Sequence, residues 1–373
     1  MPGVLINESR TGAIILELVR FANQELLSKA SRREITLDAE TPILDMGVLD
    51  SLSMVSLLTF VQTRLGVVIP DNMVLPNHFE TLGTLANLIG QLRSNGSPIH
   101  DGEAGCALLQ SIKFLETAGL RRRWLPVAAG TRIHVLEVSG AEPAWVLVPG
   151  LGNPSSSWGM VLKSLRDENA AIALDFPGFG ISRSEQVAPD YQAQVHAIWE
   201  AIRSTVKAPF VLVGSSAGSV IAADVARRAP EMVTALVVTG FGLVEDPPAW
   251  RDMLYRLSAV PEDFLKAAYY RPPKLTDTLR SLIEDVVGRP AYRAFLDGNG
   301  LAAMSSAFDG LRIPTLFVAG REDRIIPPDA VNAAAARVPS ARVEWLARCG
   351  HFPAAEQPEE LVYYIREFLK DLQ

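Results

Sequence analysis

Apolar residues recur at helical spacing in the first quarter of the chain. In three stretches they follow one another in steps of one, three or four positions, so each stretch would place one apolar face on an α-helix. This pattern predicts a small all-helical bundle over residues 1–93. The positions are Ile15, Leu18, Val19, Ala22 and Leu26; Met54, Leu57, Leu58, Val61 and Leu65; and Leu85, Leu88, Ile89 and Leu92.

The pattern changes after residues 94–106, a polar segment rich in Gly, Ser and Pro that cannot pack a core and indicates a flexible linker. Beyond it, short unbroken apolar runs alternate with helix-length stretches. Such runs are typical of strands buried on both faces of a parallel sheet, and their alternation with helices predicts a doubly wound α/β domain over residues 107–373. The runs are 145–148, 171–174, 210–213, 236–238 and 316–318, and a last strand is predicted over 342–346.

Strand signals lapse between about residues 246 and 311. This region has helical patterning and many aromatic and proline residues, among them Trp250, Tyr269 and Pro272. We interpret it as a helical cap inserted over the sheet. Its aromatic residues fit either the packing of the cap or a pocket for an apolar group.

Composition narrows the classes of function. The chain has 373 residues, 48% hydrophobic, with 35 basic and 42 acidic side chains and a net charge of −7, as expected of a folded globular protein. The densest basic run is only Arg121 to Arg123, which argues against a nucleic-acid partner. The two cysteines, Cys106 and Cys349, form no CxxC pair, so neither a disulfide framework nor a zinc site is indicated. With no apparent signal peptide or membrane-spanning run, we expect a cytoplasmic location.

A nucleophile motif follows the run at 210–213. Residues 214–218 read Gly-Ser-Ser-Ala-Gly, a match to G-x-S-x-G, and a helix-compatible stretch comes next. A sharp strand-to-helix turn of this kind holds its central serine, here Ser216, in a strained and exposed conformation. The pentapeptide alone is weak, but its position between strand and helix favours a nucleophile over an ordinary Ser/Gly turn.

A serine nucleophile needs a base and a carboxylate that orients the base. His351 follows the last predicted strand and is our candidate base. Asp323 follows the strand at 316–318 and is our candidate acid, whereas its neighbour Glu322 is interpreted as a solvated side chain. Asp246, after the preceding strand, remains an alternative acid. The other histidines, His78, His100, His134 and His196, lie outside this domain or before the turn.

The order Ser216, Asp323, His351 resembles the α/β-hydrolase superfamily from about residue 123 to residue 372. Residues 174–182 resemble a D-x-P-G-x-G-x-S loop found in capped members, which we interpret as a structural turn. The resemblance implies that the backbone amides of Leu151 and Ala217 form an oxyanion hole. Pro149 stands where such enzymes often have histidine. Backbone N–H donors do not depend on that side chain, but the proline can give the loop a different shape from that of the family.

The small domain has a serine of its own at the start of a predicted helix. Asp50-Ser51-Leu52 is preceded by a helix and a long loop. Asp and Ser are both good helix caps, so the tripeptide alone says little. Its setting resembles the acyl or peptidyl carrier proteins, four-helix bundles whose serine receives 4′-phosphopantetheine, and this implies attachment to Ser51. Ser53 and Ser56 stand where many carriers have acidic residues that partner enzymes recognise.

Together the two resemblances imply a carrier protein joined to a serine hydrolase of the thioesterase or acyltransferase type. Such a protein would release or transfer an acyl group held as a phosphopantetheine thioester, in polyketide, nonribosomal peptide or related natural-product biosynthesis. Its partners would be a phosphopantetheinyl transferase, upstream acyl-loading or synthase enzymes, and the acyl thioester substrate. The alternative is an esterase or acyltransferase acting on free substrates, with the helical domain as a docking module.

Overall fold

The structure is a computed structural model in which the chain forms two compact units, residues 1–119 with 273–282 and residues 120–272 with 283–373. The segment predicted as a linker, 94–106, lies outside the described residues except for Ser94. The residues not described are 1–2, 28–35, 47, 50, 68, 71–72, 95–111, 113–114, 117–118, 129–130, 183–189, 208 and 373.

The first unit is helical. Its long helices are α1 (Gly3–Phe21), α3 (Ser51–Leu65) and α4 (Leu82–Ser94), with a π-helical turn η1 (Ala22–Leu26) and a short 3₁₀ helix η3 (Pro76–His78). Apolar side chains from all three helices, including Leu18, Leu57 and Ile89, are fully buried in one core. These are positions of the predicted helical pattern, so its periodicity marked the buried faces correctly.

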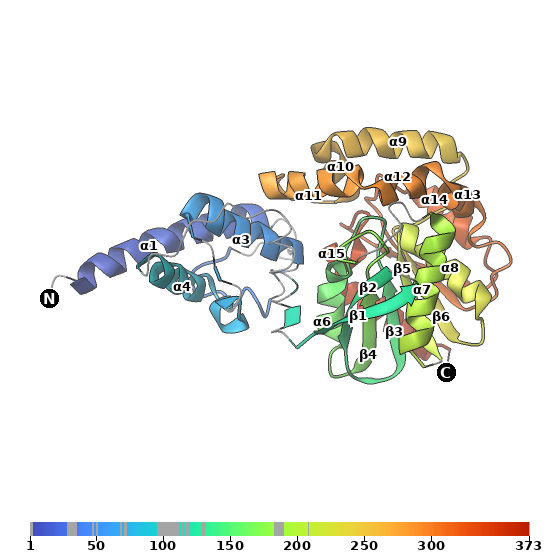
Figure 1. Cartoon of the computed structure of the whole chain (residues 1–373), viewed down its shortest axis with the longest axis horizontal. Helices are drawn as coiled ribbons and strands as arrows, with labels where there is room; N and C mark the ends of the chain where they lie inside the picture. Colours follow the sequence, from blue (N-terminus) through green and yellow to red (C-terminus); the bar gives the residue numbers. More distant parts are fainter. Residues whose placement is uncertain are drawn as a thin grey trace. The chain divides into compact units, whose positions relative to one another are not determined.

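The second unit is built on an eight-stranded sheet with the order β1-β2-β4-β3-β5-β6-β7-β8 (Figure 1). Strands β3 to β8 pair in parallel, whereas β1 and β2 form an antiparallel hairpin at one edge. The predicted doubly wound, mostly parallel sheet is therefore confirmed. The strands are β1 (Arg121–Ala128), β2 (Thr131–Val138), β3 (Ala141–Val148), β4 (Asn169–Leu174), β5 (Phe210–Ser215), β6 (Val233–Thr239), β7 (Thr315–Gly320) and β8 (Ala341–Leu346).

The central strands are wholly buried, because helices cover both faces of the sheet. Every residue of β5 and of β7 is buried, which explains their unbroken apolar runs. In Figure 1, α6 lies on one side of the strands and α7 and α8 on the other. The helices of this unit outside the predicted cap are α6 (Gly159–Leu165), α7 (Tyr191–Thr205), α8 (Ala217–Arg228), α14 (Pro328–Ala335), α15 (Pro353–Glu356) and α16 (Pro358–Lys370).

Five helices follow β6 before the chain returns to the sheet at β7, in the region interpreted from sequence as a cap. Proline in the first turn begins three of them, where its missing N–H costs no hydrogen bond. Figure 1 shows α9, α10 and α12 grouped beyond one end of the strands. The five are α9 (Pro247–Ala259), α10 (Pro261–Ala268), α11 (Asp277–Gly288), α12 (Pro290–Asp297) and α13 (Asn299–Ser306).

Candidate active site

Ser216 occupies a strained turn between β5 and α8. Its backbone angles, φ 51° and ψ −125°, lie in a region that residues other than glycine rarely adopt. The Ser216 N–H donates to Thr239 O at 2.8 Å, which ties the turn to the end of β6. A Cβ atom at Gly218 would overlap the Pro149 carbonyl, so the motif's last glycine lets the helix approach β3 closely. Ser216 is partly exposed while its neighbours are buried.

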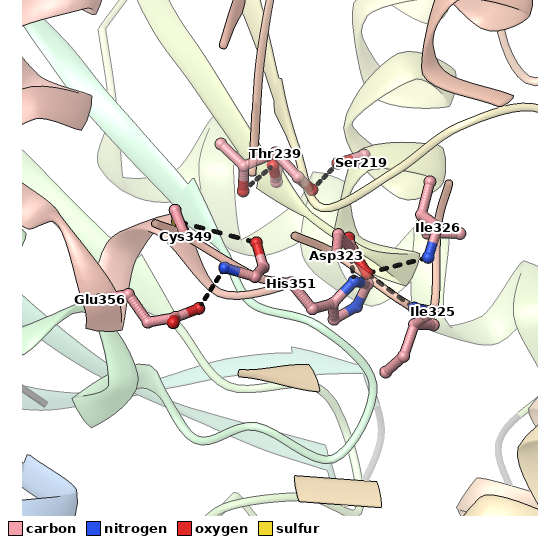
Figure 2. A network of polar contacts seen from close by, with 10 residues as sticks. Ser219, Thr239, Asp323, Ile325, Ile326, Cys349, His351 and Glu356 are labelled. Atoms are coloured by element: carbon pink, nitrogen blue, oxygen red, sulfur yellow. Dashed lines mark hydrogen bonds and ion pairs between the residues drawn. The ribbon is translucent and has the colours of Figure 1, made fainter. Parts of the chain in front are cut away.

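His351 and Asp323 meet at the ends of β8 and β7. His351 Nδ1 lies 2.9 Å from Asp323 Oδ2, and both side chains are at least 95% buried (Figure 2). The other carboxylate oxygen accepts the N–H groups of Ile325 and Ile326 at 2.8 and 2.9 Å. With Asp323 held in this way, the hydrogen bond fixes the orientation of the His351 ring and leaves Nε2 free of that partner.

Glu322 is half-buried, and its position differs from the solvated one expected from sequence. Its Oε2 atom accepts the Cys349 N–H at 3.0 Å, and its own N–H donates to Cys349 O at 3.0 Å. The loop before His351 is therefore tied to the loop that carries Asp323. Burial raises the pKa of the Cys349 thiol, so this cysteine stays protonated and is a poor nucleophile.

Glu356 is a second acidic residue that supports the His351 loop, and sequence analysis did not single it out. Its two carboxylate oxygens accept the N–H groups of Gly350 at 2.8 Å and Tyr270 at 2.9 Å. It thereby joins the residue before His351 to the segment after α10. Figure 2 shows the Glu356 side chain directed at the His351 loop. Burial raises the pKa of Glu356 to about 7, with the hydrogen bonds from the backbone acting in the opposite direction.

Asp246, the alternative acid, has a different role in the structure. Its Oδ1 atom accepts the Ala249 N–H at 3.0 Å, so it caps the N-terminus of α9. Its side chain is exposed, whereas Asp323 is buried against His351. The structure thus places Asp323, and not Asp246, beside the imidazole.

The two amides expected to form an oxyanion hole lie on segments that meet at Ser216. Ala217 is the first residue of α8, directly after the serine. A Cβ atom at Gly150 would lie 3.3 Å from Ser216 Cβ, so the loop that contains Leu151 runs beside Ser216. Gly152 has φ +83°, and a Cβ there would overlap Val286 of α11. A helix of the predicted cap thus lies directly on this loop.

A second group of Ser, His and Asp side chains lies elsewhere in the sheet. His134 Nδ1 is 3.0 Å from Ser155 Oγ and 3.6 Å from Asp175 Oδ2. All three residues are fully buried. Because no substrate could reach the buried Ser155 hydroxyl, we do not interpret this group as a second catalytic triad.

In the helical unit, Ser51 is the first residue of α3. Ser53 and Ser56, on the same helix, are only 0% and 8% exposed. Both are therefore buried in the helical unit, at positions where the carrier resemblance would place acidic residues for partner recognition. Burial also excludes them as attachment points for a bulky group, whereas a serine at a helix start can carry one without disturbing the core.

Two further observations concern metal binding and membrane insertion. The described residues contain no cluster of three or more His, Cys, Asp or Glu that could hold a metal ion. Within the same part of the chain, no helix is both long and apolar enough to cross a membrane. The described residues thus include a serine in a strained turn, a buried His–Asp pair, and a loop backbone that runs next to that turn. This set of groups suits acyl transfer through a covalent intermediate.

Comparisons with known proteins agree with this geometry. The model of the alpha/beta hydrolase family matches residues 145–362, which include Ser216, Asp323 and His351. The model of the phosphopantetheine attachment site matches residues 24–89, which include Ser51. The chain therefore carries both domain types that its sequence indicated.

Individual relatives are similar at about one residue in four. Polyketide synthase ThaQ of Burkholderia thailandensis is 27% identical over 86% of this chain, which spans only 16% of that synthase's length. A pimeloyl-[acyl-carrier protein] methyl ester esterase of Stenotrophomonas maltophilia is 26% identical over 64% of this chain and 96% of its own. Among solved structures, a membrane phospholipase A described as a bacterial virulence factor has a TM-score of 0.63 and 25% identity, over 77% of this chain and 98% of its own.

Proposed function

Because the chain belongs to the alpha/beta hydrolase family and is a serine hydrolase, we propose that Ser216, His351 and Asp323 form its catalytic triad. We propose further that this triad releases an acyl group from a thioester on the carrier domain. The observation that carries the proposal is the buried His351–Asp323 hydrogen bond, 2.9 Å long, in a chain that also has a phosphopantetheine attachment domain.

The phosphopantetheine attachment domain implies a covalently bound 4′-phosphopantetheine, and Ser51 is our proposed point of attachment within a four-helix carrier bundle. Its hydroxyl would form the phosphodiester, through the action of a phosphopantetheinyl transferase. When bound, the group supplies a thiol that carries acyl chains as thioesters. The position of Ser51 at the start of α3, and the burial of Ser53 and Ser56, support this choice.

In the proposed reaction Ser216 Oγ attacks the thioester carbonyl while His351 Nε2 takes the hydroxyl proton. Asp323 holds the ring and stabilises its positive charge. The N–H groups of Ala217 and Leu151 donate to the negative oxygen of the tetrahedral intermediate. His351 then gives the proton to the leaving sulfur, and an acyl-Ser216 ester remains.

The second half of the reaction removes the acyl group from Ser216. His351 takes a proton from water as the water oxygen attacks the ester, and returns it to Ser216 Oγ. A carboxylic acid leaves. An alcohol or amine in place of water would give an ester, lactone or amide by the same steps, with Ser216 regenerated.

Joining the two domains would favour this reaction. A flexible linker of the length predicted for residues 94–106 spans about 20 Å on average, which corresponds to local concentrations near millimolar. The similarity to a polyketide synthase supports a place in polyketide or related natural-product biosynthesis, downstream of acyl-loading or synthase enzymes.

One relative favours a second candidate. The Stenotrophomonas protein is named as a methyl ester esterase of an acyl-carrier-protein substrate. By analogy, Ser216 would hydrolyse an ester within the acyl chain and leave the thioester on the carrier intact. The two candidates use the same triad and differ in which bond is broken.

Intact mass spectrometry separates these candidates. The full chain is co-expressed with a broad-specificity phosphopantetheinyl transferase, loaded with an acyl group that carries a terminal methyl ester, and followed over time beside Ser216→Ala. Loss of the whole acyl group from the wild type alone supports thioester release. Loss of only the methyl group supports the ester hydrolase, and an identical time course for Ser216→Ala would contradict both.

A further inference from the structure

The loop after β3 is anchored at its two ends by different means. At its start, Val148 pairs with Gly214 in the sheet. At its end, the chain enters the 3₁₀ helix η4 (Ser155–Trp158). Between these points lie Gly150, Leu151 and Gly152, whose glycines restrict the backbone little. The position of the Leu151 amide therefore depends on both anchors.

At the second anchor, the Ser155 N–H meets a buried carboxylate, and the Ser155 hydroxyl lies 3.0 Å from His134 Nδ1. Asp175 Oδ1 accepts the Ser155 N–H at 2.5 Å, and Oδ2 accepts the N–H groups of Ile181 and Ser182 at 2.9 and 3.2 Å. Asp175 is fully buried. A Cβ atom at Gly180 would overlap its carboxylate, so the loop after β4 is wrapped closely around it.

The loop around Asp175 also contacts the region predicted as a cap. Arg289 Nη1, at the start of α12, donates to Gly178 O at 2.9 Å, and Arg289 Nη2 pairs with Asp285 of α11 at 2.7 Å. Val286, the residue after Asp285 in α11, lies against Gly152. The loop that Asp175 organises therefore binds Arg289, three residues after the Val286 side chain that lies against Gly152.

From this geometry we propose that Asp175 is a positioning residue for the reaction at Ser216. It holds the Ser155 end of the loop and thereby sets the place of the Leu151 N–H, the donor to the developing oxyanion. The inference rests on the proposed function, since it needs Leu151 to act in the oxyanion hole. It assigns a role in the reaction to a loop motif that sequence analysis had interpreted as a structural turn.

A matched pair of variants at Ser155 tests the proposal. Ser155→Ala removes the hydroxyl and keeps the N–H that Asp175 binds. Ser155→Pro removes both, and proline is suited to this position because Ser155 begins a helix and Pro154 before it has φ −75° and ψ 161°. Asp175→Asn is the second way to break the contact, because its amide group cannot accept from all three N–H donors.

The readouts are hydrolysis of p-nitrophenyl butyrate and the rate of Ser216 labelling by a fluorophosphonate, on the full chain below its unfolding temperature. We expect Ser155→Pro and Asp175→Asn to lower kcat about 10- to 100-fold with KM changed less than threefold, because displaced donors weaken transition-state binding. Labelling should slow similarly, since the phosphonyl oxygen uses the same donors. Ser155→Ala should stay within threefold of the wild type.

Either of the two disruptive variants suffices for the test if it retains the wild-type circular dichroism spectrum. A folded Ser155→Pro or Asp175→Asn protein with kcat within threefold of the wild type would overturn the inference. Equal losses in Ser155→Ala and Ser155→Pro would also overturn it, because the hydroxyl would then be the important group. Failure of the wild type itself to label at Ser216 would instead reject the proposed function.

Discussion

The imidazole of His351 and the carboxylate of Asp323 form a buried pair, with Nδ1 and Oδ2 2.9 Å apart across 28 residues of sequence. The hydrogen bond fixes the ring, and two backbone N–H groups fix the carboxylate. A pair shielded from water in this way is suited to orient a base and to stabilise its charged form.

We expect Asp323→Asn to lower kcat by about 10³- to 10⁴-fold, because the amide would favour the wrong imidazole tautomer. The matched control is Asp246→Asn at the alternative acid. It weakens a helix cap at a cost of about 1 kcal/mol or less and should leave kcat within threefold. Steady-state hydrolysis of p-nitrophenyl butyrate measures both. A larger loss in the Asp246 variant would assign the acid to the earlier strand.

Ser51→Ala should abolish the mass increase that a phosphopantetheinyl transferase produces on the wild-type chain. It should leave hydrolysis of a small free ester unchanged, because Ser216 lies in the other unit. Ser53→Ala is the control, since Ser53 is fully buried and should not be modified. Intact mass gives the result directly, and a modified Ser51→Ala protein would require another attachment point.

Gly152→Ala should destabilise the fold by about 1 to 3 kcal/mol and lower kcat. An alanine at φ +83° is strained, and its Cβ would displace Val286 or the loop beside Ser216. Gly310→Ala is a matched control, because Gly310 has φ +70° with no atom within 4 Å of an added Cβ. It should incur only the backbone strain, about 1 kcal/mol, with kcat unchanged. Thermal unfolding and ester hydrolysis separate the two effects.

Glu356 should make stability depend on pH. Since burial raises its pKa to about 7 from an ordinary value of 4.5, the folded state retains a proton that the unfolded state releases between these values. The contribution of Glu356 to the free energy of unfolding is therefore full below pH 4.5 and falls as pH rises to about 7. The slope is at most about 1.4 kcal/mol per pH unit.

Glu356→Gln removes this titration, so the comparison of the two proteins isolates it. The free energy of unfolding of the wild type minus that of Glu356→Gln should decrease from pH 4.5 to pH 7 and be level above about pH 8. Urea denaturation at a series of pH values gives the difference. A difference that stays constant from pH 4.5 to pH 8 would show that Glu356 titrates normally.

Local sequence determined much of this architecture. The helical periodicity around Leu57 and Ile89 marked buried faces, and the apolar runs marked strands. This is because a helix buried on one face and a strand buried on both faces each require a characteristic spacing of apolar residues. The turn at Ser216 was predictable for a similar reason. The glycines that permit this sharp turn and its close backbone approaches stand within two positions of Ser216, so the pentapeptide and its flanks contain the information.

Only the tertiary structure decided which acidic residue lies beside His351. Asp246 and Asp323 both follow a strand, and nothing in their local sequence says that one caps a helix while the other meets His351. That depends on where the ends of β6, β7 and β8 lie within the sheet.

The same holds for the support of the site. Glu322 reaches Cys349 across 27 residues, and Asp175 reaches Ser155 across 20. Such contacts join separate strands and loops, so they follow from the order and register of the whole sheet. The sequence by itself thus determined the helices, the strands and the strained turn at Ser216. The tertiary structure decided which carboxylate lies against His351 and which carboxylates anchor the loops, because packing alone brings distant residues within hydrogen-bonding distance.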